Sequence, residues 1–242
     1  MYIKTLAVAA ACILTLHTGT LQAQDLKTVL TEHFAATGAE AQSKLQSFTT
    51  TGSLNQSGID IPFKQIQMRP GKFRLEGTFQ GLTFIQTYNG TEGWSLNPFG
   101  MSSEPEPIPA DQLDDLKLQA DMDGMLWNWE SKGYEVSLDG TEDVEGTSCY
   151  KISIVTPDTS TFVQYIDAES YILIKSKSKT KMMGVDVESE TYFSNYFVQD
   201  GIAIPGRVEN RYNGMTGEVI SITKVEYNLA YDDALFNKPG TN

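Results

Sequence analysis

Turn dipeptides recur at short intervals in the first half of the chain, and they constrain its fold more than any other feature. Runs rich in aromatic and β-branched residues lie between them, so we expect strands at about 46–55, 59–69, 72–79, 82–88 and 92–97. The intervening turns include Pro70-Gly71, Gln80-Gly81 and Asn89-Gly90. Because such short connections join antiparallel neighbours, the pattern predicts a meander. Within 72–79, the apolar Phe73 and Leu75 alternate with charged residues, which predicts one apolar and one solvated face.

The stretch 98–132 interrupts the strands and predicts an inserted lid. Prolines crowd its first part and exclude regular ladder or helix there. A helix is expected from Gln112, capped by Asp111, and a second from Asp121 to Lys132. The second helix would carry a soft apolar set formed by Met122, Met125, Leu126, Trp127 and Trp129. Such a set suits either ordinary packing on the sheet or the adaptable lining of a lid above a variable ligand.

Helical spacing also predicts an amphipathic helix from Asp25 to about Leu45, bent or ended midway by Gly38. After Gly133 the strand pattern resumes, and further strands are expected at about 133–139, 148–156, 160–167, 170–182, 187–198, 202–213 and 217–229. The total is about twelve, more than a flat sheet carries without curling. No linker divides the chain, so residues 24–242 are interpreted as one domain with a strongly curved sheet.

A cationic stripe is expected on the strand at 170–182. Its lysines recur at every second position and therefore share one face: Lys175, Lys177, Lys179 and Lys181. The stripe could be a solvated outer surface whose charges discourage edge pairing, or a docking stripe for an acidic or phosphate-bearing partner.

The N-terminus reads as a secretory signal over residues 1–23, with Lys4, an apolar run to Leu16 and cleavage after Ala23. A competing interpretation takes Ala9-Ala10-Ala11-Cys12 as a lipoprotein processing site, which would leave Cys12 acylated. No other stretch approaches the roughly 18 apolar residues of a membrane span. We therefore expect an exported, soluble protein.

The charge and the scarcity of reactive side chains restrict the function. A net charge of −13 argues against nucleic acid as a partner. The segment 104–145 holds most of the excess acid, which should repel anionic lipid surfaces and suit a basic partner. After cleavage, His33 and Cys149 are the sole histidine and cysteine, so neither a nucleophile–histidine pair nor a His/Cys zinc site is recognisable. We expect no enzyme activity, cofactor or metal.

Two segments carry a resemblance to a known family. Met68 to Glu76 holds an Arg-Pro turn leading into Phe-Arg-Leu-Glu, and Tyr88 to Phe99 holds an Asn-Gly turn, a Trp and Asn-Pro-Phe. This arrangement resembles the periplasmic carriers of outer-membrane lipoproteins (LolA-like), and 134–171 resembles the form common in Bacteroidetes. The resemblance covers nearly the whole mature chain. It implies a mostly β fold with helices (α+β): an incomplete, strongly curved antiparallel β-barrel of about 11–12 strands, with an N-terminal helix and a helical lid over an apolar cavity.

The resemblance also implies a function. The protein would be a monomeric periplasmic carrier that holds the acyl chains of a lipoprotein or another lipid, taken from an inner-membrane donor and passed to an outer-membrane acceptor. Arg69 would hold the lid through hydrogen bonds to helix backbone, while Trp94, Phe99 and the 122–129 face would line the cavity or the lid. The alternative is a module that senses lipid or lipoprotein and acts through a protein partner, which acylation at Cys12 would favour.

Overall fold

The computed structural model describes residues 25–100, 104–182 and 185–240, without the side chains of residues 111, 180–182, 185 and 186. The expected signal peptide and Cys12 lie outside the described residues, and so does the side chain of Lys181.

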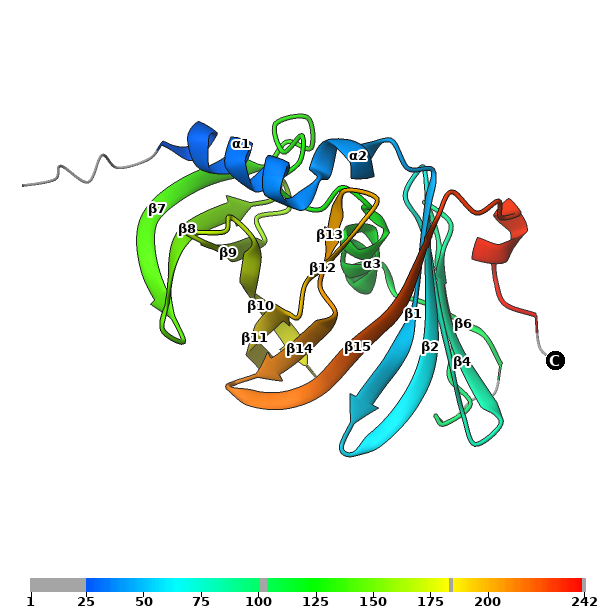
Figure 1. Cartoon of the computed structure of the whole chain (residues 1–242). Helices are drawn as coiled ribbons and strands as arrows, with labels where there is room; N and C mark the ends of the chain where they lie inside the picture. Colours follow the sequence, from blue (N-terminus) through cyan, green and yellow to red (C-terminus); the bar gives the residue numbers. More distant parts are fainter. Residues whose placement is uncertain (1–24, 101–103, 183–184, 241–242) are drawn as a thin grey trace, which may run out of the picture.

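One large antiparallel sheet forms most of the molecule (Figure 1). In the described part of the chain it has 13 strands in the order β6-β5-β4-β3-β2-β1-β15-β14-β11-β10-β9-β8-β7. The strands of the first half are β1 Ser47–Gln56, β2 Ile59–Met68, β3 Lys72–Phe79, β4 Leu82–Tyr88, β5 Gly93–Leu96 and β6 Glu106–Pro107. Those of the second half are β7 Glu135–Val144, β8 Thr147–Val155, β9 Thr161–Asp167, β10 Leu173–Met182, β11 Val185–Ser194, β14 Arg207–Tyr212 and β15 Met215–Tyr227.

The sheet curls but does not close. Its two outermost strands are β6 and β7, and in the described chain they do not pair with each other. The first strand, β1, lies in the middle of the sheet, where it pairs with β2 on one side and with the last strand, β15, on the other. The expected mostly β fold with a strongly curved, open antiparallel sheet is therefore confirmed.

The N-terminal helical segment lies across one end of the curved sheet (Figure 1). Asp25 caps α1 (Leu26–Thr37) by accepting a hydrogen bond from the Thr28 backbone N–H at 2.7 Å. Gly38 then takes a φ of 72°, which ends α1 and starts α2 (Ala39–Ser43), as its position in the sequence predicted. Val29 and Leu30 of α1 pack in a buried cluster with Ile152, Ile154, Ile166 and Leu126.

The sequence missed a separate hairpin between β11 and β14. Strands were expected at 187–198 and 202–213, but each is interrupted, and β12 (Phe197–Gln199) pairs with β13 (Ile202–Ile204) in a sheet of their own. The break comes where the Gly206 backbone N–H donates to the Asn195 carbonyl at 3.1 Å, so close that a Cβ on Gly206 would overlap that oxygen. The hairpin turns toward α1 and α2, where Ile202 and Ile204 are buried.

The inserted segment holds one helix rather than two. A 3₁₀ turn at Ala110–Gln112 leads into α3 (Leu113–Ala120), which lies inside the curve of the sheet (Figure 1). The prediction of a helix from Asp121 to Lys132 is wrong, because the structure has a series of turns there. Gly124 and Asn128 have positive φ values of 69° and 53°, which a right-handed helix does not accommodate. Here we call residues 121–133 the turn segment.

Candidate functional site

The concave face of the sheet encloses a hollow of about 720 Å³, within the usual range of ligand pockets. Its apolar lining comes from strands on both sides of β1 and includes Leu54, Phe63, Leu75, Phe84, Phe162, Val208, Ile220 and Ile222. Helix α3 contributes Asp115, Leu118 and Gln119 along one side. The hollow is thus built by the curved sheet and partly covered by the insertion.

A second, more apolar hollow of about 520 Å³ continues the first. The two share Leu54, Leu75 and Phe84, so their surfaces are continuous. The second hollow is bounded by β1–β5 and adds the apolar side chains Ile59, Ile61, Phe79 and Phe99, while Ile85 and Leu96 border it from the strand positions that share a face with Trp94. We call it the apolar sector.

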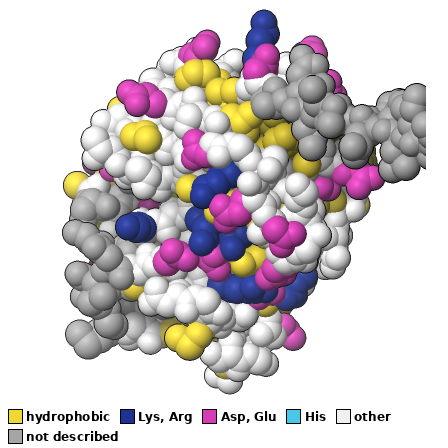
Figure 2. Space-filling view, turned by 90° about the vertical axis from the view of Figure 1, so that its left-hand side faces the viewer, with side chains coloured by type: hydrophobic (Ala, Val, Ile, Leu, Met, Phe, Trp, Pro, Cys, Tyr) yellow, Lys and Arg dark blue, Asp and Glu magenta, His cyan; other side chains and the backbone are white. Residues whose placement is uncertain are grey.

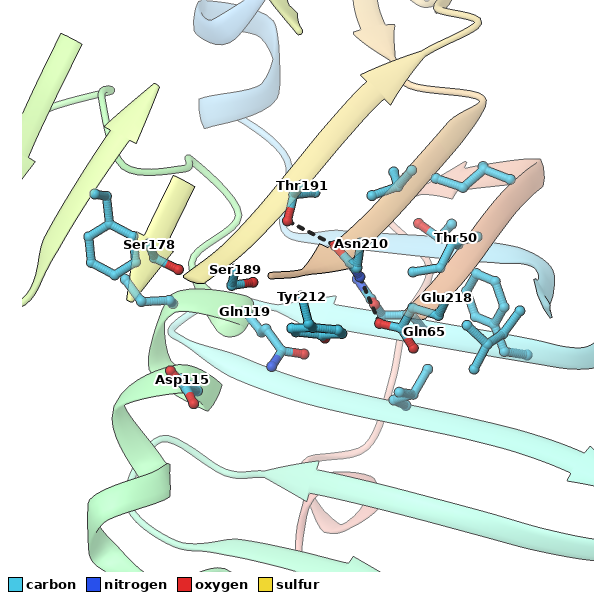
Figure 3. A pocket seen from close by; sticks show the side chains of 18 of the residues that line it. Thr50, Gln65, Asp115, Gln119, Ser178, Ser189, Thr191, Asn210, Tyr212 and Glu218 are labelled. Atoms are coloured by element: carbon cyan, nitrogen blue, oxygen red, sulfur yellow. Dashed lines mark hydrogen bonds between the residues drawn. The ribbon is translucent and has the colours of Figure 1, made fainter. Parts of the chain in front are cut away.

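A set of polar side chains lines the part of the first hollow over β10, β11, β14 and β15, beside the apolar Val208, Ile220 and Ile222 (Figure 3). The Thr191 hydroxyl pairs with Asn210 Oδ1 at 2.8 Å, and Asn210 Nδ2 donates to Glu218 Oε1 at 2.7 Å. Tyr212 lies beside this chain, and burial together with the charge of Glu218 raises the pKa of its phenol. We call these residues, with Ser178 and Ser189, the polar sector.

A β-bulge sets the geometry of the polar sector. Asn210 pairs with Glu218, but Arg211 pairs with Thr216, so Gly217 is the extra residue. The Tyr212 ring lies where a Cβ on residue 217 would stand, 2.7 Å from its ring carbons. Glycine at this position therefore lets the ring lie against the strand, next to Glu218.

Helix α3 is held against the sheet by its buried side. Leu116 and Ala120 pack on Phe73 and Tyr88, while Gln67 Nε2 donates to the Gln119 carbonyl at 2.5 Å. On the side facing the hollow, burial and then the neighbouring Asp114 raise the pKa of Asp115. The helix is thus the part of the insertion that borders the first hollow.

Arg69, at the end of β2, joins three parts of the molecule. Its Nη1 and Nη2 donate to Asp123 Oδ2 and Oδ1 at 2.8 and 2.5 Å, and its Nε donates to the Leu45 carbonyl at 2.7 Å. The hydrogen bonds that Arg69 donates to Asp123 are the main reason that the pKa of Arg69 is raised. Arg69 thus contacts the insertion through the Asp123 carboxylate, since the turn segment contains no helix; its one hydrogen bond to helix backbone goes from Nη2 to the Gln42 carbonyl of α2, at 3.5 Å.

The Met- and Trp-rich side chains of the turn segment pack as core beneath the N-terminal helices. Met122 lies with Leu45, Ile202 and Val225, whereas Leu126 lies against α1. Met125 and Trp129 pack on the same cluster as Leu126, and the Trp127 ring meets Phe34 edge-on with 5.0 Å between centroids. These five residues do not line either hollow, because the turns direct four of them toward α1 and Met122 toward Leu45 and Ile202.

Phe99 and Trp94 have different positions. Phe99 is 48% exposed and lines the apolar sector, with its ring centroid 6.2 Å from that of Phe79. Trp94 lies on the outer face, where the Lys238 ammonium sits 5.0 Å from its ring centroid. The strand alternation explains this difference from the prediction, since Gly93 and Ser95 face inward and Trp94 therefore faces outward.

The lysines of β10 meet acids on the outer face. Lys175 Nζ lies 2.6 Å from Glu190, and Lys177 Nζ lies 3.1 Å from Glu190 and 3.2 Å from Glu188, both on β11. Figure 2 shows cationic and acidic side chains interleaved across this side of the molecule. Lys179, near the end of the strand, lines the first hollow. The docking stripe remains a prediction.

Sequence reasoning singled out neither Thr191, Asn210 nor Glu218. The alternation of 207–212 would have placed Asn210 on the same face as Val208, but the bulge at Gly217 has no sequence signal strong enough to align Glu218 with it. Two absences concern the described residues alone. Their helices are all too short or too polar to cross a membrane. They also contain no group of three or more His, Cys, Asp or Glu side chains able to hold a metal ion.

Comparison with known proteins gives a fold but no family. No protein-family model matches the chain, and no curated protein matches its sequence. A DUF1329 family protein from Desulfovibrio piger matches with a TM-score of 0.59 at 17% identity, over 86% of this chain and 97% of that one. A LolA superfamily protein from Nitrosomonas europaea matches with a TM-score of 0.59 at 14% identity, over 89% and 99%.

A third solved structure, a putative outer membrane lipoprotein-sorting protein domain from Vibrio parahaemolyticus, has a TM-score of 0.56 at 10% identity, over 86% of this chain and 97% of its own. At such identities the likeness concerns the fold alone. The protein is therefore similar in fold to DUF1329 and LolA superfamily proteins.

Proposed function

We propose that the protein is a carrier that holds acyl chains in its concave hollow. The observation that carries this proposal is the apolar sector, a continuous groove floored by β1–β5 and continuous with the larger hollow. Burial of each CH₂ contributes about 0.8 kcal/mol, so roughly ten methylene groups in this groove would gain about 8 kcal/mol before the costs of ordering.

A carrier must also release its cargo. The insertion offers a means, because closing it over an empty hollow would compete with ligand and subtract from the gross binding energy. We propose Arg69 as the latch of this closed state. Its two hydrogen bonds to Asp123 hold the turn segment, which leads directly from α3 at the edge of the hollow.

The cargo and the route are part of the same proposal. The fold likeness to a lipoprotein-sorting domain supports an acylated lipoprotein or another lipid as ligand. We further propose a non-enzymatic periplasmic protein of the form common in Bacteroidetes, receiving cargo from an inner-membrane donor and delivering it to an outer-membrane acceptor.

Fluorescent fatty-acid binding tests the carrier proposal. Val208 lines the first hollow, so Val208→Trp should fill the space and weaken binding at least about tenfold. Val198, on the β12–β13 hairpin, is 71% exposed, so Val198→Trp makes the same change outside the hollow and should bind like the unaltered protein. Equal binding by both variants, or no uptake by the unaltered protein, would contradict the proposal.

A further inference from the structure

The two hollows differ in chemistry. The apolar sector lies over β1–β5, whereas the side chains of the polar sector lie over β10, β11, β14 and β15, next to the apolar Val208, Ile220 and Ile222 (Figure 3). A simple acyl chain would not be stabilised by the polar sector, because covering polar groups with hydrocarbon removes their water without replacing its hydrogen bonds. The division therefore suits an amphiphile that lies lengthwise, with its chains on one side and its headgroup on the other.

Glu218 is the charged centre of the polar sector. A carboxylate offers about four acceptor positions, and Asn210 Nδ2 fills one of them. No ion pair joins Glu218 to a Lys, Arg or His side chain in the described part of the chain, although acids on the outer face, such as Glu190 and Glu209, are paired with cations. The hollow thus presents a carboxylate with acceptor capacity left for a ligand.

The neighbouring side chains hold the Glu218 carboxylate in position without forming an ion pair with it. Thr191 orients the amide of Asn210, so that its NH₂ group and not its oxygen meets Glu218. The Gly217 bulge brings Tyr212 beside Glu218, and Asp115 adds a second acid on the opposite side of the hollow, so among the described residues two carboxylates line it against the single ammonium of Lys179. The arrangement favours a group that donates several hydrogen bonds and carries positive charge, and it disfavours an anion.

We propose that the polar sector selects lipids whose headgroup carries a primary amine, with the ammonium donating to Glu218 and the acyl chains lying on the apolar sector. This inference rests on the proposed carrier function and names its ligand class. A primary ammonium has three N–H donors, whereas a quaternary ammonium has the same charge and none. A hydrogen bond between charged partners is worth enough to separate the two by at least about tenfold in affinity.

The test is displacement of a bound fluorescent fatty acid by three soluble phospholipids with identical short acyl chains. The headgroups are phosphoethanolamine, phosphocholine and phosphoglycerol. We expect the ethanolamine lipid to displace the probe at a concentration at least about tenfold lower than the choline lipid, with the glycerol lipid weakest because it is anionic.

Glu218→Gln keeps the shape and the Asn210 contact but removes the charge. It should abolish the preference for the ethanolamine lipid, while the fatty-acid probe, which has no amine, still binds and shows that the hollow is intact. Glu226→Gln is the matched control in the same strand, since Glu226 pairs with Lys224 outside the hollow. It should keep the full preference.

Each outcome separates the two proposals. Fatty-acid uptake with equal affinity for all three headgroups, or an unchanged preference in Glu218→Gln, overturns the amine selectivity and leaves the carrier function standing. Failure of the unaltered protein to bind the probe or any of the lipids overturns both.

Discussion

Arg69 and Asp123 stand 54 residues apart in the chain, yet they meet through two parallel hydrogen bonds of 2.8 and 2.5 Å. The pair joins the end of β2 to the turn segment, and its side chains are 26% and 16% exposed. A planar guanidinium that meets a carboxylate in this way fixes direction as well as distance. The contact therefore holds the insertion in one position relative to the sheet.

The first prediction concerns the stability of this pair. In a double-mutant cycle of Arg69→Leu and Asp123→Asn, urea unfolding should give a coupling free energy of about 1–3 kcal/mol, because both side chains are largely shielded from water. The exposed pair Lys44–Glu40, at 2.8 Å, is the control and should show no measurable coupling under the same treatment. Similar coupling free energies in both pairs would show that the Arg69–Asp123 contact stabilises the fold no more than an exposed ion pair does.

The second prediction concerns cargo release. If the closed empty state offsets ligand binding, weakening it with Arg69→Leu or Asp123→Asn should increase retention of the fatty acid and slow its transfer to acceptor vesicles. Dissociation and transfer rates measure this directly. Unchanged retention and transfer in both variants would refute the latch role of Arg69.

The third prediction separates core residues from lining residues. Leu126 is 3% exposed in the cluster beneath α1, so Leu126→Ala should lower the free energy of unfolding by about 2–5 kcal/mol. Phe99 is half-exposed over the apolar sector, so Phe99→Ala should change stability by less than about 1 kcal/mol and weaken fatty-acid binding. If Leu126→Ala instead weakened fatty-acid binding without loss of stability, the turn segment would line the lid, as the sequence predicted.

The fourth prediction concerns pH. His33 is buried, its Nδ1 lies 2.8 Å from the Tyr171 carbonyl, and burial lowers its pKa despite that hydrogen bond. The unfolded chain therefore binds a proton at higher pH than the folded chain, and stability should fall as the pH drops below about 6.5, by at most about 1.4 kcal/mol per pH unit from this group. His33→Asn should flatten the free energy of unfolding between about pH 7.5 and 5.5. If the free energy of unfolding of the variant fell with pH as steeply as that of the unaltered protein, groups other than His33 would be responsible for the pH dependence.

The fifth prediction concerns the thiol. Cys149 is fully buried, and burial raises its pKa to about 11. In the chain beginning at Gln24 it should react with a disulfide reagent at pH 8 only as fast as the protein unfolds, because the thiolate is the reactive form. Rapid reaction in the folded protein would contradict the described packing of β8.

The meander could be predicted from the sequence because short turns with Gly at Gly71, Gly81 and Gly90 leave few ways to connect neighbouring strands. Likewise, Gly38 marked the end of α1 through its left-handed conformation. These features are local, and local sequence determines them.

The sequence-based predictions were wrong where contacts between distant parts of the chain determine the local structure. The Met- and Trp-rich turn segment has the composition of a helix, but positive φ at Gly124 and Asn128 and the Lys132 ion pair with Asp121 fold it into turns. The sequence predicted that Trp94 and its neighbours in β5 point to alternate faces of the sheet, but it did not show which of the two faces is concave. The polar sector depends on a bulge that aligns Asn210 with Glu218 across two strands.

The most direct test of the account is native mass spectrometry of the protein isolated from cells without detergent. A lipid should be bound to the isolated protein and lost on extraction with organic solvent, and the emptied protein should bind a fatty acid when incubated with one. A protein isolated empty, which also takes up no acyl ligand when one is supplied, would contradict the account.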